Sequence, residues 1–162
     1  MTSSSGSPGL DDALQGAPTI LTTVQIRRTP EQVFDLVSNP SLWHTWHPAT
    51  RSVRDAPTRP LGTGESVLEL ITAGGRRFEA RWTVQRCERP TLWEISTDTG
   101  RGSAHIVYRL QATSAGCSFE RCLRFRSHHG PWRWLDHSLM RWILRRQSLR
   151  ALANLQRVAE AP

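Results

Sequence analysis

Arg121 is the residue of this chain whose surroundings most clearly suggest chemistry. It lies in an alternating segment, where it shares one face with the apolar residues Cys117, Phe119, Leu123 and Phe125. An unpaired buried charge costs several kcal/mol, so an arginine on such a face needs an anion or another acceptor. Three alternatives stay open. Arg121 meets a carboxylate, phenolate or enolate oxygen of a ligand, a β-bulge turns it outward, or it forms a buried pair with Glu69.

Tyr108 is the single tyrosine, and alternation places it on an inward face with Ala104, Ile106 and Leu110. A buried hydroxyl needs a partner, which is either a structural neighbour or a substrate carbonyl to which it donates.

His44 and His47 stand three residues apart, a spacing at which a helix can offer two ligands to a metal. No HExxH, CxxC or acidic loop supplies the remaining ligands, and no GxSxG places a nucleophile. We therefore expect no metal, no cofactor and no covalent catalysis, and we interpret the two histidines as side chains near a pocket mouth.

The elements that must position these residues are mainly strands. The segment from Thr19 to Arg28 alternates, and a helix beginning at Pro30 with Thr29 as its N-cap follows. Asn39-Pro40 ends that helix, and a second short helix runs from Ser41 to Trp46. Five further strands are predicted over residues 65–72, 77–87, 92–97, 103–112 and 117–127.

A long helix is predicted from Gly130-Pro131 to about Ala159. Its apolar stripe is expected to contain Leu135, Leu139, Trp142, Leu149 and Ala153.

Composition indicates one globular domain. The 162 residues are enough for a core, and residues 1–18, rich in Ser, Gly, Ala and Pro, are expected to be a disordered leader. Three cysteines are too few for a disulfide framework, which favours a cytoplasmic location. No run approaches the roughly 20 apolar residues of a membrane span. The net charge is +7, but the arginines are scattered, which argues against a nucleic-acid footprint.

Several short motifs occur in a familiar order. Thr29-Pro30-Glu31-Gln32-Val33-Phe34 precedes Asn39-Pro40 and Trp43-x-x-Trp46-x-Pro48, and Gly62-Thr63-Gly64, Trp82-x-Val84, Pro90, Trp93 and Tyr108-x-Leu110 follow. This order resembles the SRPBCC superfamily, which includes START domains, pollen-allergen-like proteins and polyketide cyclases/dehydratases. The resemblance implies an α+β helix-grip fold over residues 19–160. In that fold a curved antiparallel sheet of about seven strands wraps around the long C-terminal helix, and two short helices follow the first strand.

The resemblance also implies an apolar cavity between the sheet and the long helix. The residues expected to line it are Trp46, Phe78, Trp82, Trp93, Ile106, Tyr108, Phe119, Arg121, Phe125, Leu139 and Trp142. The first hypothesis is that the cavity binds a small hydrophobic molecule, a lipid, polyketide or aromatic compound, whose polar end Arg121 or Tyr108 orients. A polyketide cyclase/dehydratase-type enzyme is the alternative, and a module that interacts through its basic surface is the second alternative.

Overall fold

The computed structural model describes residue 14 and residues 16–73, 76–100, 102–127 and 133–162. Most of the leader predicted over residues 1–18 lies outside the described residues. At its end, Leu14 is buried, and its carbonyl accepts a hydrogen bond from the N–H of Ala17 (3.0 Å).

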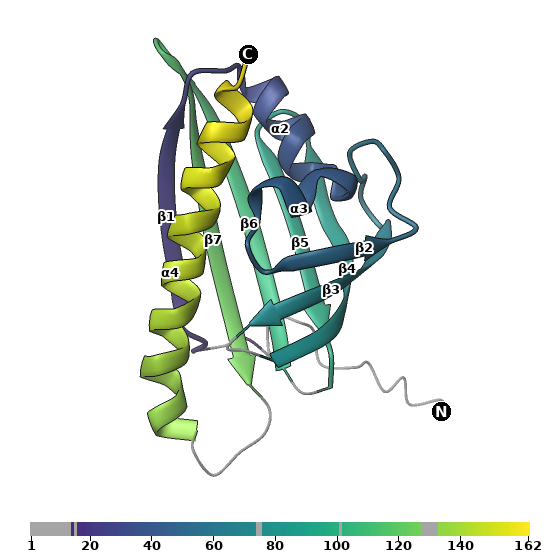
Figure 1. Ribbon diagram of the computed structural model, residues 1–162, viewed down its shortest axis with the longest axis vertical. Coiled ribbons are helices and arrows are strands. Elements are labelled where there is room, and N and C mark those ends of the chain that lie inside the picture. The colour runs from purple at the N-terminus through teal and green to yellow at the C-terminus, as the bar shows by residue number, and fades with distance from the viewer. Residues whose placement is uncertain (1–13, 15, 74–75, 101, 128–132) are drawn as a thin grey trace, which may run out of the picture.

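One seven-stranded sheet forms the body of the molecule (Figure 1). Its strands in chain order are β1 (Thr19–Ile26), β2 (Thr50–Arg54), β3 (Ser66–Ala73), β4 (Arg76–Glu88), β5 (Leu92–Asp98), β6 (Gly102–Thr113) and β7 (Gly116–Ser127). Their order across the sheet is β1-β7-β6-β5-β4-β3-β2, and every neighbouring pair is antiparallel. The curved sheet, the short helices after β1 and the long C-terminal helix confirm the predicted helix-grip fold.

Strand β2 is the one strand that sequence analysis did not assign to a segment. It is an edge strand of five residues, most of them exposed, so it lacks the alternation of a half-buried strand.

The first helical segment follows the predicted pattern closely. Helix α2 (Pro30–Ser38) begins with a capping box, in which Thr29 Oγ1 accepts from the Gln32 backbone N–H and Gln32 Oε1 accepts from the Thr29 N–H. Val33, Phe34 and Val37 form its fully buried face. A 3₁₀ turn (Pro40–Leu42) and the one-turn helix α3 (Trp43–Trp46) replace the single predicted helix over 41–46.

Helix α4 (Arg133–Glu160) lies along the concave side of the sheet, next to β1 and β7 (Figure 1). Its C-terminal half is firmly attached. Ala151 and Leu155 are fully buried, Asn154 Nδ2 donates to the Trp46 carbonyl (3.2 Å), and Glu160 forms an ion pair with Arg27 (2.8 Å).

The predicted apolar stripe of α4 faces solvent at every position where the structure describes its side chains, and the side chain of Leu135 lies outside that description. Leu139, Trp142 and Leu149 are 59%, 54% and 51% exposed. The inward face instead carries Met140, Leu144, Ser148, Ala151, Leu152 and Leu155. The sequence pattern is ambiguous here because each face carries one interruption, Ser148 on the inward face and Arg146 on the outward one, and both faces are otherwise apolar. None of the helices in the described ranges has the length and apolar content to cross a bilayer.

Candidate functional site

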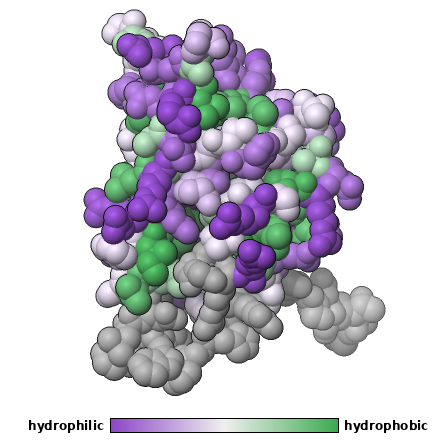
Figure 2. Space-filling view, in the orientation of Figure 1, coloured by the Kyte–Doolittle hydropathy of each residue, from purple (hydrophilic) through white to green (hydrophobic). Residues whose placement is uncertain are grey.

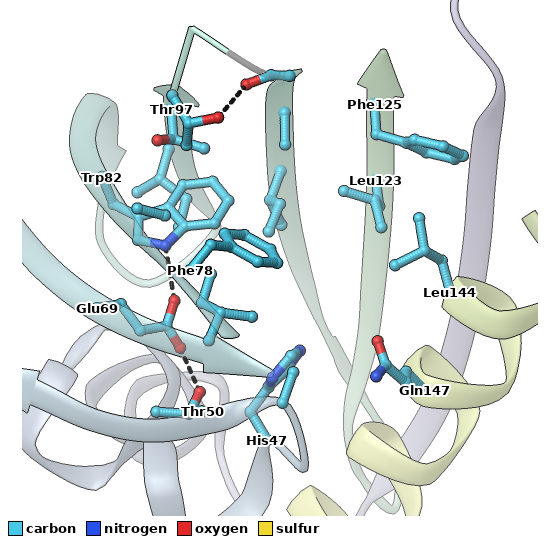
Figure 3. Close-up of a pocket in the computed structure, with 18 of the residues that line it drawn as sticks. His47, Thr50, Glu69, Phe78, Trp82, Thr97, Leu123, Phe125, Leu144 and Gln147 are labelled. Carbon is cyan, nitrogen blue, oxygen red and sulfur yellow. Dashed lines mark hydrogen bonds between the residues drawn. The ribbon is translucent and has the colours of Figure 1, made fainter. Parts of the chain in front are cut away.

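A cavity of about 680 Å³ lies between the concave face of the sheet and the inward side of α4. Its wall is mostly apolar. Seven of the residues predicted to line it do so: Trp46, Phe78, Trp82, Ile106, Tyr108, Arg121 and Phe125. The helix contributes Met140, Leu144, Gln147 and Ser148. Figure 3 shows Leu144 and Gln147 on the helix side of the cavity.

Four predicted wall residues lie elsewhere. The prediction is wrong for Leu139 and Trp142, because both lie on the outward face of α4. Trp93 and Phe119 do point inward, but they are fully buried in the core and do not line the cavity. Trp93 packs edge-on against Trp43 of α3, with ring centroids 6.1 Å apart, and its Nε1 donates to the Leu61 carbonyl (3.0 Å). The short helices therefore cover the part of the sheet where Trp93 and Phe119 were expected to line the cavity.

Arg121 points inward and is only 3% exposed. The pairing of β7 with both neighbours is continuous past it, so no bulge turns it outward. Its Nη1 donates to Ser148 Oγ of α4 (2.7 Å), and within the described ranges no ion pair joins it to Glu69. Its Nε is buried without a partner. The guanidinium thus retains an unused donor in the cavity wall.

Glu69 is a buried carboxyl on β3 that also lines the cavity. It accepts hydrogen bonds from Trp82 Nε1 (2.6 Å) and from Thr50 Oγ1 (Figure 3). Burial raises its pKa above the ordinary value, although these two donors and the charge of Arg121 oppose the rise. The site therefore contains a carboxyl that takes up a proton more readily than an exposed one.

His47 lies at the end of α3 and faces the same cavity (Figure 3). Burial and the nearby charge of Arg121 lower its pKa to about 3, so the imidazole is neutral at physiological pH. Its Nδ1 and the Nε1 of the neighbouring Trp46 are both buried without hydrogen-bond partners. His44 is exposed, whereas His47 is half-buried and lines the cavity with its Nδ1 turned away from solvent.

Tyr108 is buried among aromatic rings at the inner end of the cavity. It stacks on Trp93 with centroids 5.6 Å apart and contacts Phe119 at 5.1 Å. Burial raises the pKa of its hydroxyl, which Arg121 partly offsets, so the phenol stays protonated and can act as a donor.

Together these side chains form a polar cluster, which we define as His47, Glu69, Tyr108, Arg121 and Ser148. The sequence predicted Tyr108 and Arg121 in the cavity wall, offered Glu69 only as a structural partner of Arg121 and His47 only as a residue near the mouth, and did not point to Ser148. A signal for Glu69 was present, because Val67, Glu69 and Ile71 alternate inward on β3 just as Arg121 does on β7. Ser148 had no comparable signal, since a small hydroxyl on a helix is compatible with either face.

Known proteins share this architecture. The protein TTHA0849 from Thermus thermophilus superposes with a TM-score of 0.75 at 13% identity, covering 88% of this chain and 97% of that one. The KanY protein gives 0.69 at 16% identity, with 90% and 99% covered. Ara h 8.0201 gives 0.64 at 12%, with 89% and 98% covered. These TM-scores show a common fold, and at such low identities they show nothing beyond it.

No curated protein matches the sequence significantly. Residues 18–160 do match a family model described as polyketide cyclase / dehydrase and lipid transport. This match covers most of the chain and agrees with the order of motifs from Thr29 to Leu110. The chain belongs to this polyketide cyclase / dehydrase and lipid transport family of the SRPBCC superfamily.

Proposed function

We propose that the protein binds a small, largely hydrophobic molecule in the cavity, with one oxygen-bearing end placed against the polar cluster. The observation that carries this proposal is a mostly apolar space of about 680 Å³ with a buried arginine in its wall. Cavities of roughly 300–1,000 Å³ with a few convergent polar groups are typical of small-molecule sites.

Arg121 is the residue expected to select the polar end. Ser148 and Tyr108 hydrogen-bond to the guanidinium, but its buried Nε has no partner, and Glu69 is already held by Trp82 and Thr50. A ligand carboxylate, phenolate or enolate would accept from the remaining N–H groups in a low-dielectric site, where charge-assisted hydrogen bonds are strong.

Fluorescence titration with 1-anilinonaphthalene-8-sulfonate tests whether the cavity takes up a ligand. The expected result is saturable binding that a Leu144→Trp substitution, which fills the cavity from α4, abolishes. Binding that survives this substitution would place the probe elsewhere and contradict the proposal. Native mass spectrometry of protein purified from its own host would identify the class of any retained molecule.

Displacement of the probe by decanoate and by decanol tests the role of Arg121. We expect wild-type protein to prefer decanoate about tenfold, which is the contribution of one hydrogen bond to a charged group. Arg121→Gln should remove that preference. If this variant folds poorly, Ser148→Ala serves as a second variant of the same site, and it should retain binding. Arg81→Gln, which changes an exposed arginine on β4, is the matched control. Equal displacement by both compounds would refute the orienting role.

A cyclase/dehydratase-type activity is the second candidate, and Glu69 is the observation that favours it. A carboxyl with a raised pKa beside an arginine and a neutral imidazole can move a proton to or from an enolisable carbonyl compound. Incubation with a poly-β-keto thioester analogue, followed by mass spectrometry for loss of water, checks this role. Turnover that persists in Glu69→Gln would exclude this carboxyl as the proton carrier.

A further inference from the structure

The outward face of α4 is an apolar stripe with no partner among the described residues. Leu139, Trp142 and Leu149 are each more than half exposed, and Ala153 is exposed as well. Spacings of three, seven and four place these side chains on one side of a helix. Because the opposite side packs on the sheet, α4 is apolar on two opposite faces. Figure 2 shows hydrophobic residues exposed over the lower part of this helix among hydrophilic ones. We call the outward residues Leu139, Trp142, Leu149 and Ala153 the outer stripe.

Arginines surround the outer stripe. Arg145 and Arg150 flank it on its two sides, and Arg146 lies within it with its guanidinium 4.8 Å from the ring centroid of Trp142. None of these three takes part in an ion pair within the described ranges. No Asp or Glu occurs from residue 137 to residue 159, so nothing on the helix itself offsets this charge.

We propose that the outer stripe docks the protein on the surface of an anionic lipid bilayer, with α4 lying in the plane of the interface. Leucine side chains would enter the boundary of the acyl chains, and the indole of Trp142 would lie at headgroup level. The flanking arginines would contact lipid phosphates while their aliphatic stems cover apolar surface.

Charge decides between this occupant and a second copy of the chain. A symmetric dimer through the outer stripe would bring two sets of arginines together without any acidic residue from this face to pair with them. An anionic membrane supplies both the opposite charge and an apolar interior. The arginines of this face match the charge, and its leucines and tryptophan match the apolar interior.

The location of the outer stripe also relates docking to the cavity. Met140 and Leu144 line the cavity from the same segment of α4 that carries Leu139 and Trp142 outward. A bilayer touching this segment would therefore lie one helix diameter from the cavity wall. Docking through the outer stripe does not require the cavity to bind a lipid.

Co-sedimentation with vesicles tests the proposal on the full chain. We expect binding to phosphatidylcholine vesicles that contain phosphatidylglycerol, much weaker binding to phosphatidylcholine alone, and loss of binding as salt is raised. Leu139→Ser combined with Trp142→Ser should weaken binding about tenfold or more, because the apolar contact is lost. Leu21→Ser is the matched control, since Leu21 is a 57% exposed leucine on β1.

A second pair of variants separates the outer stripe from the general charge of the protein. Arg145→Gln with Arg150→Gln should weaken binding to the anionic vesicles about thirtyfold, at about fivefold for each arginine. Arg81→Gln with Arg124→Gln removes the same charge from exposed positions on the sheet and should have a much smaller effect. Equal losses in both double variants would show nonspecific attraction and overturn the assignment.

Two other outcomes would also overturn it. One is the absence of vesicle binding at low salt. The other is a dimer in light scattering that Leu139→Ser with Trp142→Ser converts to a monomer, which would make the outer stripe a subunit interface. Thermal unfolding of every variant checks that these exposed substitutions leave the fold intact.

Discussion

The two ends of the concave sheet face both carry inward aromatic side chains but differ in what covers them. At one end, which we call the closed end, Trp93 and Phe119 are fully buried beneath the short helices and the C-terminal half of α4. At the other, the open end, Phe78 is 40% exposed and lines a cavity. Aromatic residues pointing inward therefore do not by themselves decide between core and cavity. The elements that cover the sheet decide it.

The polar residues follow the same division. Inward positions at the closed end are almost entirely apolar, whereas Glu69, Arg121 and Ser148 lie where the cavity begins. Buried charges are costly, so their placement beside unfilled space is consistent with a ligand that completes their hydrogen bonding.

Substitution of Trp93 by alanine should have the largest effect on stability. The fully buried indole contacts Trp43 and Tyr108 and donates to Leu61. Its removal should lower the free energy of unfolding by about 3–5 kcal/mol, measured by urea denaturation. A milder loss in Trp93→Phe would be the expected control. A loss under about 1 kcal/mol in the alanine variant would mean that the closed end is loosely packed.

Acidification should destabilise the protein through His47. Its pKa is about 3 in the folded protein and 6.5 as an ordinary imidazole, so only the unfolded chain gains a proton between these values. The contribution of the neutral His47 to the free energy of unfolding is therefore fully present above pH 6.5. It is lost as pH falls from 6.5 towards 3, by at most about 1.4 kcal/mol per pH unit. The raised pKa of Glu69 acts in the opposite sense, stabilising the fold as pH falls. In urea denaturation across this range, the free energy of unfolding of His47→Gln should fall less steeply with decreasing pH than that of the wild-type protein. An equally steep fall in this variant would show that another group is responsible.

Removal of the cap of α2 should have a moderate effect at the closed end. Thr29→Ala deletes the oxygen that accepts from the Gln32 N–H and should cost about 1 kcal/mol in chemical denaturation. Thr29→Ser keeps that oxygen and should restore most of the stability. If both variants lost the same amount, the threonine methyl group rather than the cap would be responsible.

Phe78→Ala should have the smallest effect on stability and sharpen the contrast with Trp93. Because Phe78 is partly exposed, the free energy of unfolding should change by less than about 1 kcal/mol. The affinity for 1-anilinonaphthalene-8-sulfonate should fall, because the ring lines the cavity. A large loss of stability with unchanged probe affinity would place Phe78 in the core rather than in a binding wall.

Local patterns in the sequence were sufficient for most elements. The Thr29–Gln32 box begins α2, and alternation along β4 places Ala80, Trp82 and Val84 on the buried face. The same alternation turned Arg121 inward. These predictions were correct because cap chemistry and the two-residue period of a strand depend only on near neighbours.

The amino-acid sequence by itself determined the order of most elements and the inward face of the long strands, and it offered Arg121 as a candidate buried charge, which the continuous pairing of β7 then showed to point inward. Only the tertiary structure decided where along those strands the core ends and the cavity begins. It also decided that the inward face of α4 is the one with Ser148, leaving Leu139 and Trp142 outside. The physical reason is that alternation along a strand specifies only the direction of each side chain. Whether the space in front of that side chain is filled depends on contacts between segments that lie far apart in the chain.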